Sequence, residues 1–387
     1  MLIGIIGTPN KGKSSLFSAL TLNDVKIANY PFTTIDPNKG IAYVKKQCVE
    51  KELNTKCNAR NSLCINSIRY IPINIIDVAG LVENAYKGRG MGNQFLNDLS
   101  NCDAFIIVTD ISGKTNSEGY QANLDYNPIK DIKIVINELV KWISSIIIKH
   151  KKTYKNNKEE FYKLLAGFKI DKHIIKHAIE INSLPDNFEW SEEQTDKFSR
   201  NIIENSKPFI IAANKYDVDN EEIGKNIEDL KKEFGENKVI ECSAAIELAL
   251  RKAEKQEIIK YNNDSFEIIN KNITKEQQDA LNIIAGFLKI KKTNIQELIN
   301  KLIFEILNNI TVYPVEDENK YTDHFGNVLP DVILIKNKAL CIDLAEIIHS
   351  ELAKGMLYAI NAKTRQKISK NYELKDNDVI KIVSAIK

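Results

Sequence analysis

Several features that mark other classes of protein are missing from this 387-residue sequence. No run of about 18 apolar residues occurs, which excludes an ordinary membrane-spanning helix, and no charged leader precedes the first apolar segment. The formal net charge is only +2, so no overall field draws the chain to nucleic acid. The six cysteines include no C-x-x-C pair, which is typical of free thiols in a reducing compartment. We therefore expect a cytoplasmic protein that makes no membrane contact.

The composition allows a sizeable core, because 43% of the residues are hydrophobic and 27% are charged. The length predicts about two or three domains. The chain opens with a strand–loop–helix pattern in which an apolar run is followed by G-x-x-x-x-G-K-S, beginning at Gly7. Glycines let backbone N–H groups surround phosphate oxygens at a helix N-terminus, and the lysine adds a cation for the outer phosphates. The pattern predicts a nucleoside triphosphate site with these binding residues: Asn10, Lys11, Gly12, Lys13, Ser14 and Ser15.

A second motif selects the base. A buried-strand pattern from 208 to 213 ends in N-K-Y-D, which contains Asn214, Lys215 and Asp217. A carboxylate at this place accepts hydrogen bonds from guanine N1 and the exocyclic amine, and adenine lacks that pair of donors. The next strand pattern ends in Ser243 and Ala244, whose backbone N–H groups we expect to face the guanine oxygen.

Residues that sense the triphosphate are expected between these motifs. A strand pattern over 68–76 stops at D-V-A-G, which predicts that Asp77 holds Mg²⁺ through water and that Gly80 turns its N–H toward the γ-phosphate. Upstream, N-Y-P-F-T-T-I offers a hydroxyl, for which we favour Thr34 over Thr33. The predicted magnesium ligands are Ser14, Thr34 and Asp77.

Together these motifs resemble the Obg–YchF family of P-loop GTPases. The resemblance is carried by "NYPFTTIDPNKG", "DVAGLVENAYKGRGMGNQFLNDL" and "NPIKDIKIVINEL", which occur in this order. Typical YchF-type proteins have a changed base-recognition motif and prefer ATP, whereas this chain keeps N-K-Y-D and so resembles a GTP-binding branch. The resemblance implies an α/β P-loop GTPase domain with a helical insertion, followed by a small α+β, β-grasp TGS domain.

The expected catalytic residues are Lys13, Thr34, Gly80 and Asn10. Ras-type enzymes place a glutamine after D-x-x-G to orient the attacking water, but this chain has Leu81 there, so intrinsic hydrolysis should be slow. Asn10 is similar to an asparagine that holds K⁺ beside the phosphates in potassium-activated relatives. The alternative is a loop asparagine that hydrogen-bonds its own backbone. Arg89 is either an internal arginine finger or an ordinary surface arginine.

The predicted domains follow the same patterns. Residues 1–124 and 206–261 form the GTPase domain, 125–205 a coiled-coil-like helical insertion, 262–310 a helical connector and 311–387 the TGS domain. Within the insertion, a helix is expected from 127 to about 152, and Ser191 with Gln194 forms a capping-box signature at the start of the last helix.

These expectations predict a switch that converts GTP to GDP and phosphate and acts in translation or ribosome function. Its expected partner is the ribosome or RNA, and its expected cofactor is Mg²⁺. Activation by K⁺ or by a partner is left open. Two alternatives stay open: a non-catalytic GTP-bound scaffold for RNA or protein, and an ATPase like typical YchF-type proteins. The motifs do not decide the oligomeric state, for which a monomer is favoured.

The cysteines at 48, 57 and 64 are the remaining feature of the N-terminal half. Zinc ligation by these three is an alternative to isolated thiols, but the sequence shows neither a fourth ligand nor the usual short pair. We therefore expect no metal there.

Overall fold

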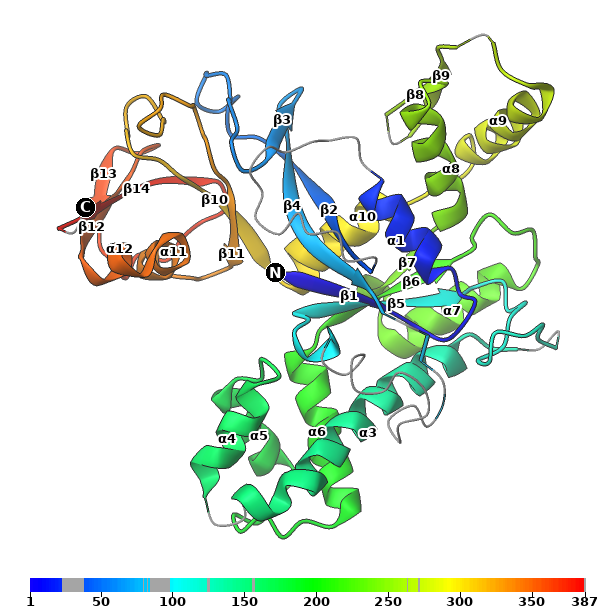
Figure 1. Cartoon of the computed structure of the whole chain (residues 1–387), viewed down its shortest axis with the longest axis horizontal. Coiled ribbons are helices and arrows are strands. Elements are labelled where there is room, and N and C mark those ends of the chain that lie inside the picture. Colours follow the sequence, from blue (N-terminus) through cyan, green and yellow to red (C-terminus); the bar gives the residue numbers. More distant parts are fainter. Residues whose placement is uncertain are drawn as a thin grey trace. The chain divides into compact units, whose positions relative to one another are not determined.

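The structure, a computed structural model, describes residues 1–22, 38–78, 80–81, 83, 98–123, 126–154, 157–262, 264–270 and 272–385. By compactness the described chain divides into two units (Figure 1). The first contains residues 1–22, 38–41 and 74–298, and the second contains 42–73 and 299–385, each with the gaps given above. The division differs from the predicted domains, because 42–73 group with the C-terminal part of the chain and the predicted connector is divided between the two units after residue 298.

A parallel sheet organises the first unit. Its strands are β1 (Leu2–Ile6), β5 (Ala104–Asp110), β6 (Phe209–Asn214) and β7 (Val239–Glu241), and β1 also pairs in parallel with the end of β4 (Ile68–Asp77). The whole sheet has the order β2-β4-β1-β5-β6-β7, where β2 is Lys39–Gln47, and β3 (Leu63–Ile65) pairs with β4. β5 is buried at every position, as expected of a central parallel strand covered on both faces.

The register brings four loops to one edge of this sheet. Ile5 pairs with Asp77, and Asp110 pairs with Asn214, so the carboxyl ends of β1, β4, β5 and β6 finish together. Helix α1 (Lys13–Thr21) begins directly after the first of these loops. Open parallel sheets bind ligands at this edge.

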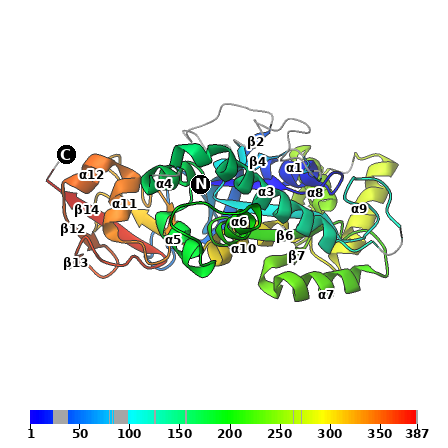
Figure 2. The ribbon, with the colours of Figure 1, turned by 90° about the horizontal axis from the view of Figure 1, so that it is seen from below.

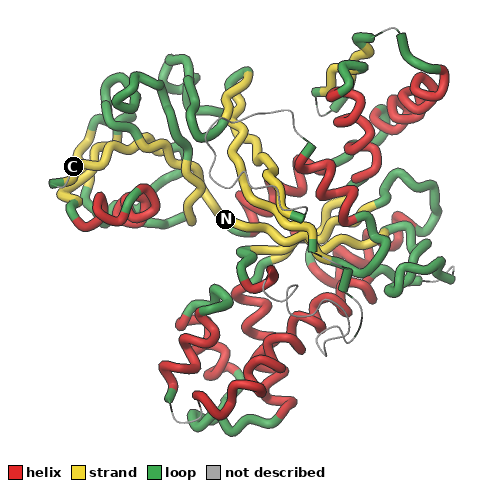
Figure 3. Tube along the Cα trace, viewed as in Figure 1, coloured by secondary structure: helices red, strands yellow, loops and turns green. Residues whose placement is uncertain are grey.

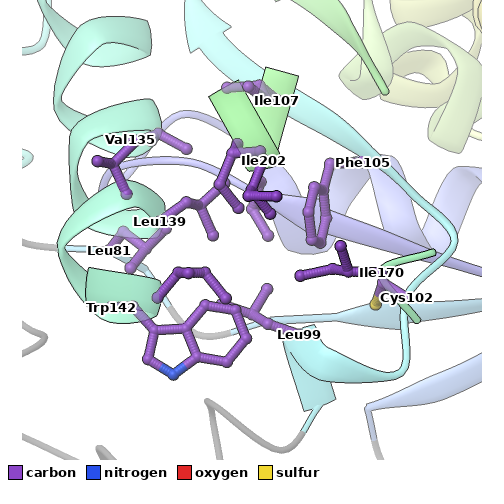
Figure 4. Packing of buried hydrophobic residues seen from close by; sticks show 14 of the residues in the cluster. Leu81, Leu99, Cys102, Phe105, Ile107, Val135, Leu139, Trp142, Ile170 and Ile202 are labelled. Atoms are coloured by element: carbon purple, nitrogen blue, oxygen red, sulfur yellow. The ribbon is translucent and has the colours of Figure 1, made fainter. Parts of the chain in front are cut away.

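Helices follow the order that the sequence predicts. The insertion contains α3 (Ile129–Tyr154), α4 (Lys158–Ala166), α5 (Lys172–Ile181) and α6 (Glu192–Ser206), which Figure 3 shows as a group of red helices. The predicted capping box is confirmed, because Ser191 and Gln194 exchange side-chain and backbone hydrogen bonds at the start of α6. Apolar side chains of α3 and α6 meet those of β5, among them Leu139, Ile202 and Phe105 (Figure 4).

After β6 come α7 (Ile223–Phe234), a short 3-10 turn (Glu236–Lys238), β7 and α8 (Ala244–Lys255). The predicted helical connector is wrong in its first part, because β8 (Ile259–Tyr261) and β9 (Phe266–Ile268) form an antiparallel hairpin there. Hydrogen bonds from Ser265 to Asn262 close its turn, a local effect that helical periodicity does not reveal. Helices α9 (Lys275–Leu288) and α10 (Ile295–Lys301) then follow, and Figure 2 shows α9 in yellow.

The second unit contains a five-stranded mixed sheet in the order β11-β10-β14-β12-β13. Its elements after the π-helical turn Leu302–Ile306 are β10 (Asn309–Pro314), β11 (Ile333–Lys336), α11 (Cys341–Ile348), α12 (Ser350–Lys354), β12 (Met356–Asn361), β13 (Gln366–Ile368) and β14 (Asp378–Ser384). β10 and β14 are parallel, and Leu344 of α11 packs with Val312 and Ile380 in their core. The predicted β-grasp arrangement of strands around one helix is confirmed. Within the described residues, no helix is long and apolar enough to cross a membrane.

Candidate nucleotide-binding site

The loop between β1 and α1 has the backbone of an anion cradle. Gly12 adopts φ +92°, and a Cβ there would lie 2.3 Å from Nδ2 of Asn214. Gly7 has φ +154°, and a Cβ would lie 2.5 Å from the carbonyl oxygen of Val108. Both positions therefore require glycine, for conformation and for space. α1 then directs its N-terminal N–H groups and the positive end of its dipole to the loop.

Lys13 begins α1 inside this cradle. Its Nζ donates a hydrogen bond to the carbonyl of Thr8 at 2.9 Å, and burial lowers the pKa of Lys13 to about 8. A Cβ built on Gly80 would lie 3.3 Å from the same Nζ, so Gly80 is a direct neighbour of the lysine, as expected for two groups that serve one phosphate. A phosphate in contact with Lys13 would restore its charge.

Ser14 and Asp77 form the candidate magnesium site. The Ser14 hydroxyl donates to Oδ2 of Asp77 at 2.8 Å, and burial raises the pKa of Asp77 against the opposing effects of Ser14 and Lys13. The other carboxylate oxygen, Oδ1, is buried and has no hydrogen-bond partner among the described residues. A hard cation fits this unsatisfied oxygen and the adjacent hydroxyl, both of which are ligand types that Mg²⁺ prefers.

Leu81 turns away from the cradle. Its N–H donates to the carbonyl of Gly7 at 3.0 Å, while its side chain is 2% exposed and belongs to the core near Leu99 and Trp142 (Figure 4). The residue that follows D-x-x-G in this chain therefore has a packing role, and its side chain offers nothing to orient water.

Asn214 connects the three loops of the site. Its Nδ2 donates to the carbonyl of Lys11 at 2.8 Å, and its Oδ1 accepts from the N–H of Ala244 at 3.0 Å. Next to it, the Ser243 hydroxyl donates to Oδ1 of Asp217. The predicted base-recognition residues are thus brought together, and the exposed Asp217 carboxylate is fixed in orientation by a neighbour. The expectation that the N–H groups of Ser243 and Ala244 face the guanine oxygen is not met in this structure, because they donate to the carbonyl of Thr293 and to Oδ1 of Asn214.

Lys215 is held by a residue that sequence reasoning missed. Its Nζ lies 2.8 Å from Oδ2 of Asp110, which is fully buried at the end of β5. Burial alone would raise the pKa of Asp110, but hydrogen bonds from Lys215, Ser112 and Thr115 hold it below its usual value. A carboxylate at the end of a central strand was the available signal. The ion pair fixes the stem of Lys215 across the site.

The side chains of Lys11 and Asn10 make different contacts. The Lys11 side chain is fully buried, pairing with Asp131 at 2.9 Å and donating to the carbonyl of Thr115 at 2.7 Å, so only its backbone faces the cradle. Asn10, at φ +59°, donates from Nδ2 to the carbonyl of Gly119 at 2.9 Å. This bond to another loop replaces the bond to its own backbone that the sequence left as an alternative.

Three residues named from the sequence cannot be placed. Thr33, Thr34 and Arg89 lie outside the described residues. Ser15 lies in the first turn of α1 beside Ser14, where its backbone belongs to the N-terminus of the helix.

Three family profiles match the chain. They are described as a 50S ribosome-binding GTPase (residues 2–155), an Obg-like GTPase, YGR210-like, G4 motif-containing domain (residues 212–317) and a TGS domain (residues 325–384). The G4 profile begins two residues before Asn214, and the first profile covers the cradle and Asp77.

Relatives agree with these profiles. An uncharacterized GTP-binding protein of Methanocaldococcus jannaschii is 49% identical over 396 residues, which cover 100% of both chains. The ribosome-binding ATPase YchF of Mycoplasma genitalium is 34% identical over 54% of this chain and 55% of its own. The crystal structure of a GTP-binding protein from Pyrococcus horikoshii OT3 has a TM-score of 0.79 and 33% identity, and the match covers 100% of both chains. The chain therefore belongs to the Obg–YchF family of P-loop GTP-binding proteins and carries a C-terminal TGS domain.

Proposed function

We propose that this protein binds GTP with Mg²⁺ at the cradle and hydrolyses it slowly to GDP and phosphate. The observation that supports the proposal is the position of Asn214, which joins the phosphate loop at Lys11 to the loop of Ala244 and stands three residues before Asp217. In this proposal Lys13 contacts the outer phosphates and Ser14 with Asp77 holds the metal, with Thr34 as a further ligand. The backbone of the cradle, including Lys11, Gly12 and Ser15, surrounds the phosphates.

The choice of GTP over ATP follows from the carboxylate of Asp217. An adenine in its place would leave that carboxylate without the two donors of guanine, and an unpaired polar group of this kind costs about 10⁴-fold in selectivity at sites built around it. Relatives named ATPases make ATP the competing substrate. Competition of each nucleotide against a fluorescent GTP analogue tests this point. Preference for ATP would overturn the use of Asp217.

Slow hydrolysis is proposed because Leu81 is buried in the core and offers no group to position water. A monovalent cation can supply part of the missing stabilisation of charge at the phosphates. Nδ2 of Asn10 donates to the carbonyl of Gly119, which leaves the amide oxygen as the atom that we propose to bind K⁺.

Single-turnover hydrolysis in KCl and in NaCl tests the catalytic proposal. We expect faster phosphate release in KCl, and a smaller difference in Asn10→Gly, because glycine keeps the positive φ of this position and removes only the amide. Phosphate release in neither salt, with or without ribosomes, would favour the non-catalytic scaffold instead.

A cytoplasmic role at the ribosome is proposed from the relatives, two of which are named ribosome-binding. The helical insertion and the TGS domain are the proposed contact parts. Co-sedimentation with ribosomes in the presence of GDP, of a non-hydrolysable GTP analogue and of no nucleotide is the test. Binding that ignores the nucleotide would contradict a switch.

A further inference from the structure

Three cysteines and a glutamate of the second unit converge, although Cys48, Glu50 and Cys57 lie in the connection between β2 and β3 and Cys64 lies in β3. The ligand atoms of Cys48, Glu50, Cys57 and Cys64 all lie within 4.8 Å of one another. All three cysteines are free thiols, and Cys48 is buried. The fourth donor that the cysteine spacing did not reveal is therefore a carboxylate, placed two residues after Cys48.

This donor set has the size and chemistry of a zinc site. Zinc binds thiolates at about 2.3 Å, so a tetrahedron around it holds its sulfurs about 3.8 Å apart, and small rotamer changes bring the observed group to that size. Thiolates exclude magnesium and calcium, which take oxygen ligands, and a carboxylate is a common fourth ligand for zinc. Four protein ligands leave no open position, which is typical of a structural site.

A buried cation accompanies the cysteines. Arg69 of β4 is 0% exposed and donates from its guanidinium to Sγ of Cys57 at 2.6 Å. Its other acceptors are the Ser62 hydroxyl and the carbonyl oxygens of Leu329 and Pro330, all of which are neutral. Within the described part of the chain Arg69 has no carboxylate partner. Because a buried charge needs an opposite charge, this arrangement favours anionic sulfur beside Arg69.

The surroundings of the cluster supply the outer hydrogen bonds that metal thiolates usually have. The N–H of Cys57 donates to Oε2 of Glu50 at 2.8 Å, which orients that carboxylate. The ring of Tyr313 stacks near Arg69, and the guanidinium carbon lies 5.6 Å from the ring centroid. The buried hydroxyl of Tyr313 has no hydrogen-bond partner among the described residues. Three thiolates and a carboxylate carry four negative charges, of which zinc and Arg69 together balance three.

We propose that Cys48, Glu50, Cys57 and Cys64 bind one structural Zn²⁺, with Arg69 as its buried counter-charge. The metal fixes the chain between β2 and β3, which has little regular structure of its own, and Arg69 connects it to the loop at Leu329 by donating both to Cys57 Sγ and to the Leu329 carbonyl. This site is separate from the nucleotide cradle, and its existence does not depend on the proposed function.

Metal analysis of the full chain tests the proposal. The protein is purified without an affinity tag that binds metal, under reducing conditions, and its zinc and iron are measured per chain before and after incubation with excess Zn²⁺ and gel filtration. We expect about one zinc per chain. Occupancy below about one tenth after this reconstitution, or occupancy by iron, would overturn the proposal.

Cobalt substitution and matched variants identify the ligands. Co²⁺ in the wild-type protein should give intense thiolate-to-metal bands and the visible bands of a tetrahedral ion. Cys57→Ser and Cys64→Ser should lower zinc occupancy at least tenfold, and Glu50→Gln should shift the visible cobalt bands while keeping the thiolate bands. The control Cys341→Ala removes a buried cysteine of the same unit outside the cluster and should retain one zinc. Unchanged occupancy in both serine variants, or absence of thiolate bands in the wild-type protein, would refute the site.

Discussion

The ammonium of Lys11 lies 2.9 Å from Oδ2 of Asp131, and both side chains are withdrawn from solvent. Asp131 stands in the first turn of α3, where the helix dipole favours a negative charge, and it also accepts hydrogen bonds from Thr8, Thr109 and Tyr126. This network joins the phosphate loop to the first helix of the insertion. It couples two segments of the first unit that are separated by more than a hundred residues.

Replacing Asp131 tests how much this buried pair supports the fold. Asp131→Asn leaves the Lys11 charge buried without a counter-charge, for which we expect a loss of about 3–5 kcal/mol in the free energy of unfolding. The control is Lys133→Ala, on the same helix as Asp131. It removes an exposed ion pair with Glu233 and should cost about 1 kcal/mol or less. Urea unfolding followed by circular dichroism measures both. Equal losses in the two variants would contradict a structural role for the buried pair.

Two glycines share a positive φ but differ in ψ, which is 24° at Gly12 and 138° at Gly235, and in what surrounds them. Gly12 has φ +92° and a Cβ there would lie 2.3 Å from the Asn214 amide, whereas Gly235 has φ +95° and open space within 4 Å. Gly235→Ala should cost about 1–3 kcal/mol of stability through conformation alone, with unchanged GTP affinity. Gly12→Ala should carry the smaller conformational cost of a left-handed residue but should also displace Asn214, lowering GTP affinity at least tenfold in a fluorescence titration. Similar GTP affinities for the two variants would show that the contact between Gly12 and Asn214 does not shape the site.

The sequence could predict the parts of the site that are formed by short motifs of consecutive residues. The loop before α1, the strand that ends at Asp77 and the strand that ends at Asn214 each carry a motif next to an apolar run, so local pattern gives both identity and place. The burial of Lys11 could not be predicted, because it depends on Asp131 far along the chain. Glu50, the fourth donor of the cysteine cluster, could not be predicted either, because its distance in sequence from the cysteines matches no usual metal-ligand spacing. The counter-charge Arg69 has the sequence pattern of an ordinary strand residue.

Base selectivity provides a sharp test of Asp217. Asp217→Asn replaces an acceptor by an amide that can donate, so it should weaken GTP binding by about 10²- to 10⁴-fold and improve binding of xanthosine triphosphate, which has an oxygen where guanine has its amine. Asp219→Asn changes an exposed carboxylate of the same loop and is the matched control. Competition titrations with GTP, ATP and xanthosine triphosphate measure the change. Unchanged selectivity in Asp217→Asn would remove this residue from the base site.

Lys13 makes a prediction about pH. Burial lowers its pKa to about 8 in the free protein, so at pH 9 about nine tenths of the lysines are neutral. Phosphates next to the ammonium favour its charged form and raise that pKa, so nucleotide binding must take up a proton at pH 9 and does so little at pH 7. The affinity for GTP should therefore fall as the pH rises above about 8, by up to about tenfold per pH unit.

Calorimetry of GTP binding at pH 9, in buffers of different ionisation enthalpy, measures this uptake directly. We expect close to one proton per nucleotide in the wild-type protein. Lys13→Arg is the control, because a guanidinium stays charged throughout this pH range. We expect this variant to bind GTP more weakly than the wild-type protein, without proton uptake and with an affinity that changes less with pH. A binding enthalpy at pH 9 that is the same in every buffer for the wild-type protein would mean that Lys13 is already charged before the phosphates arrive, and that its contact with them differs from the one proposed.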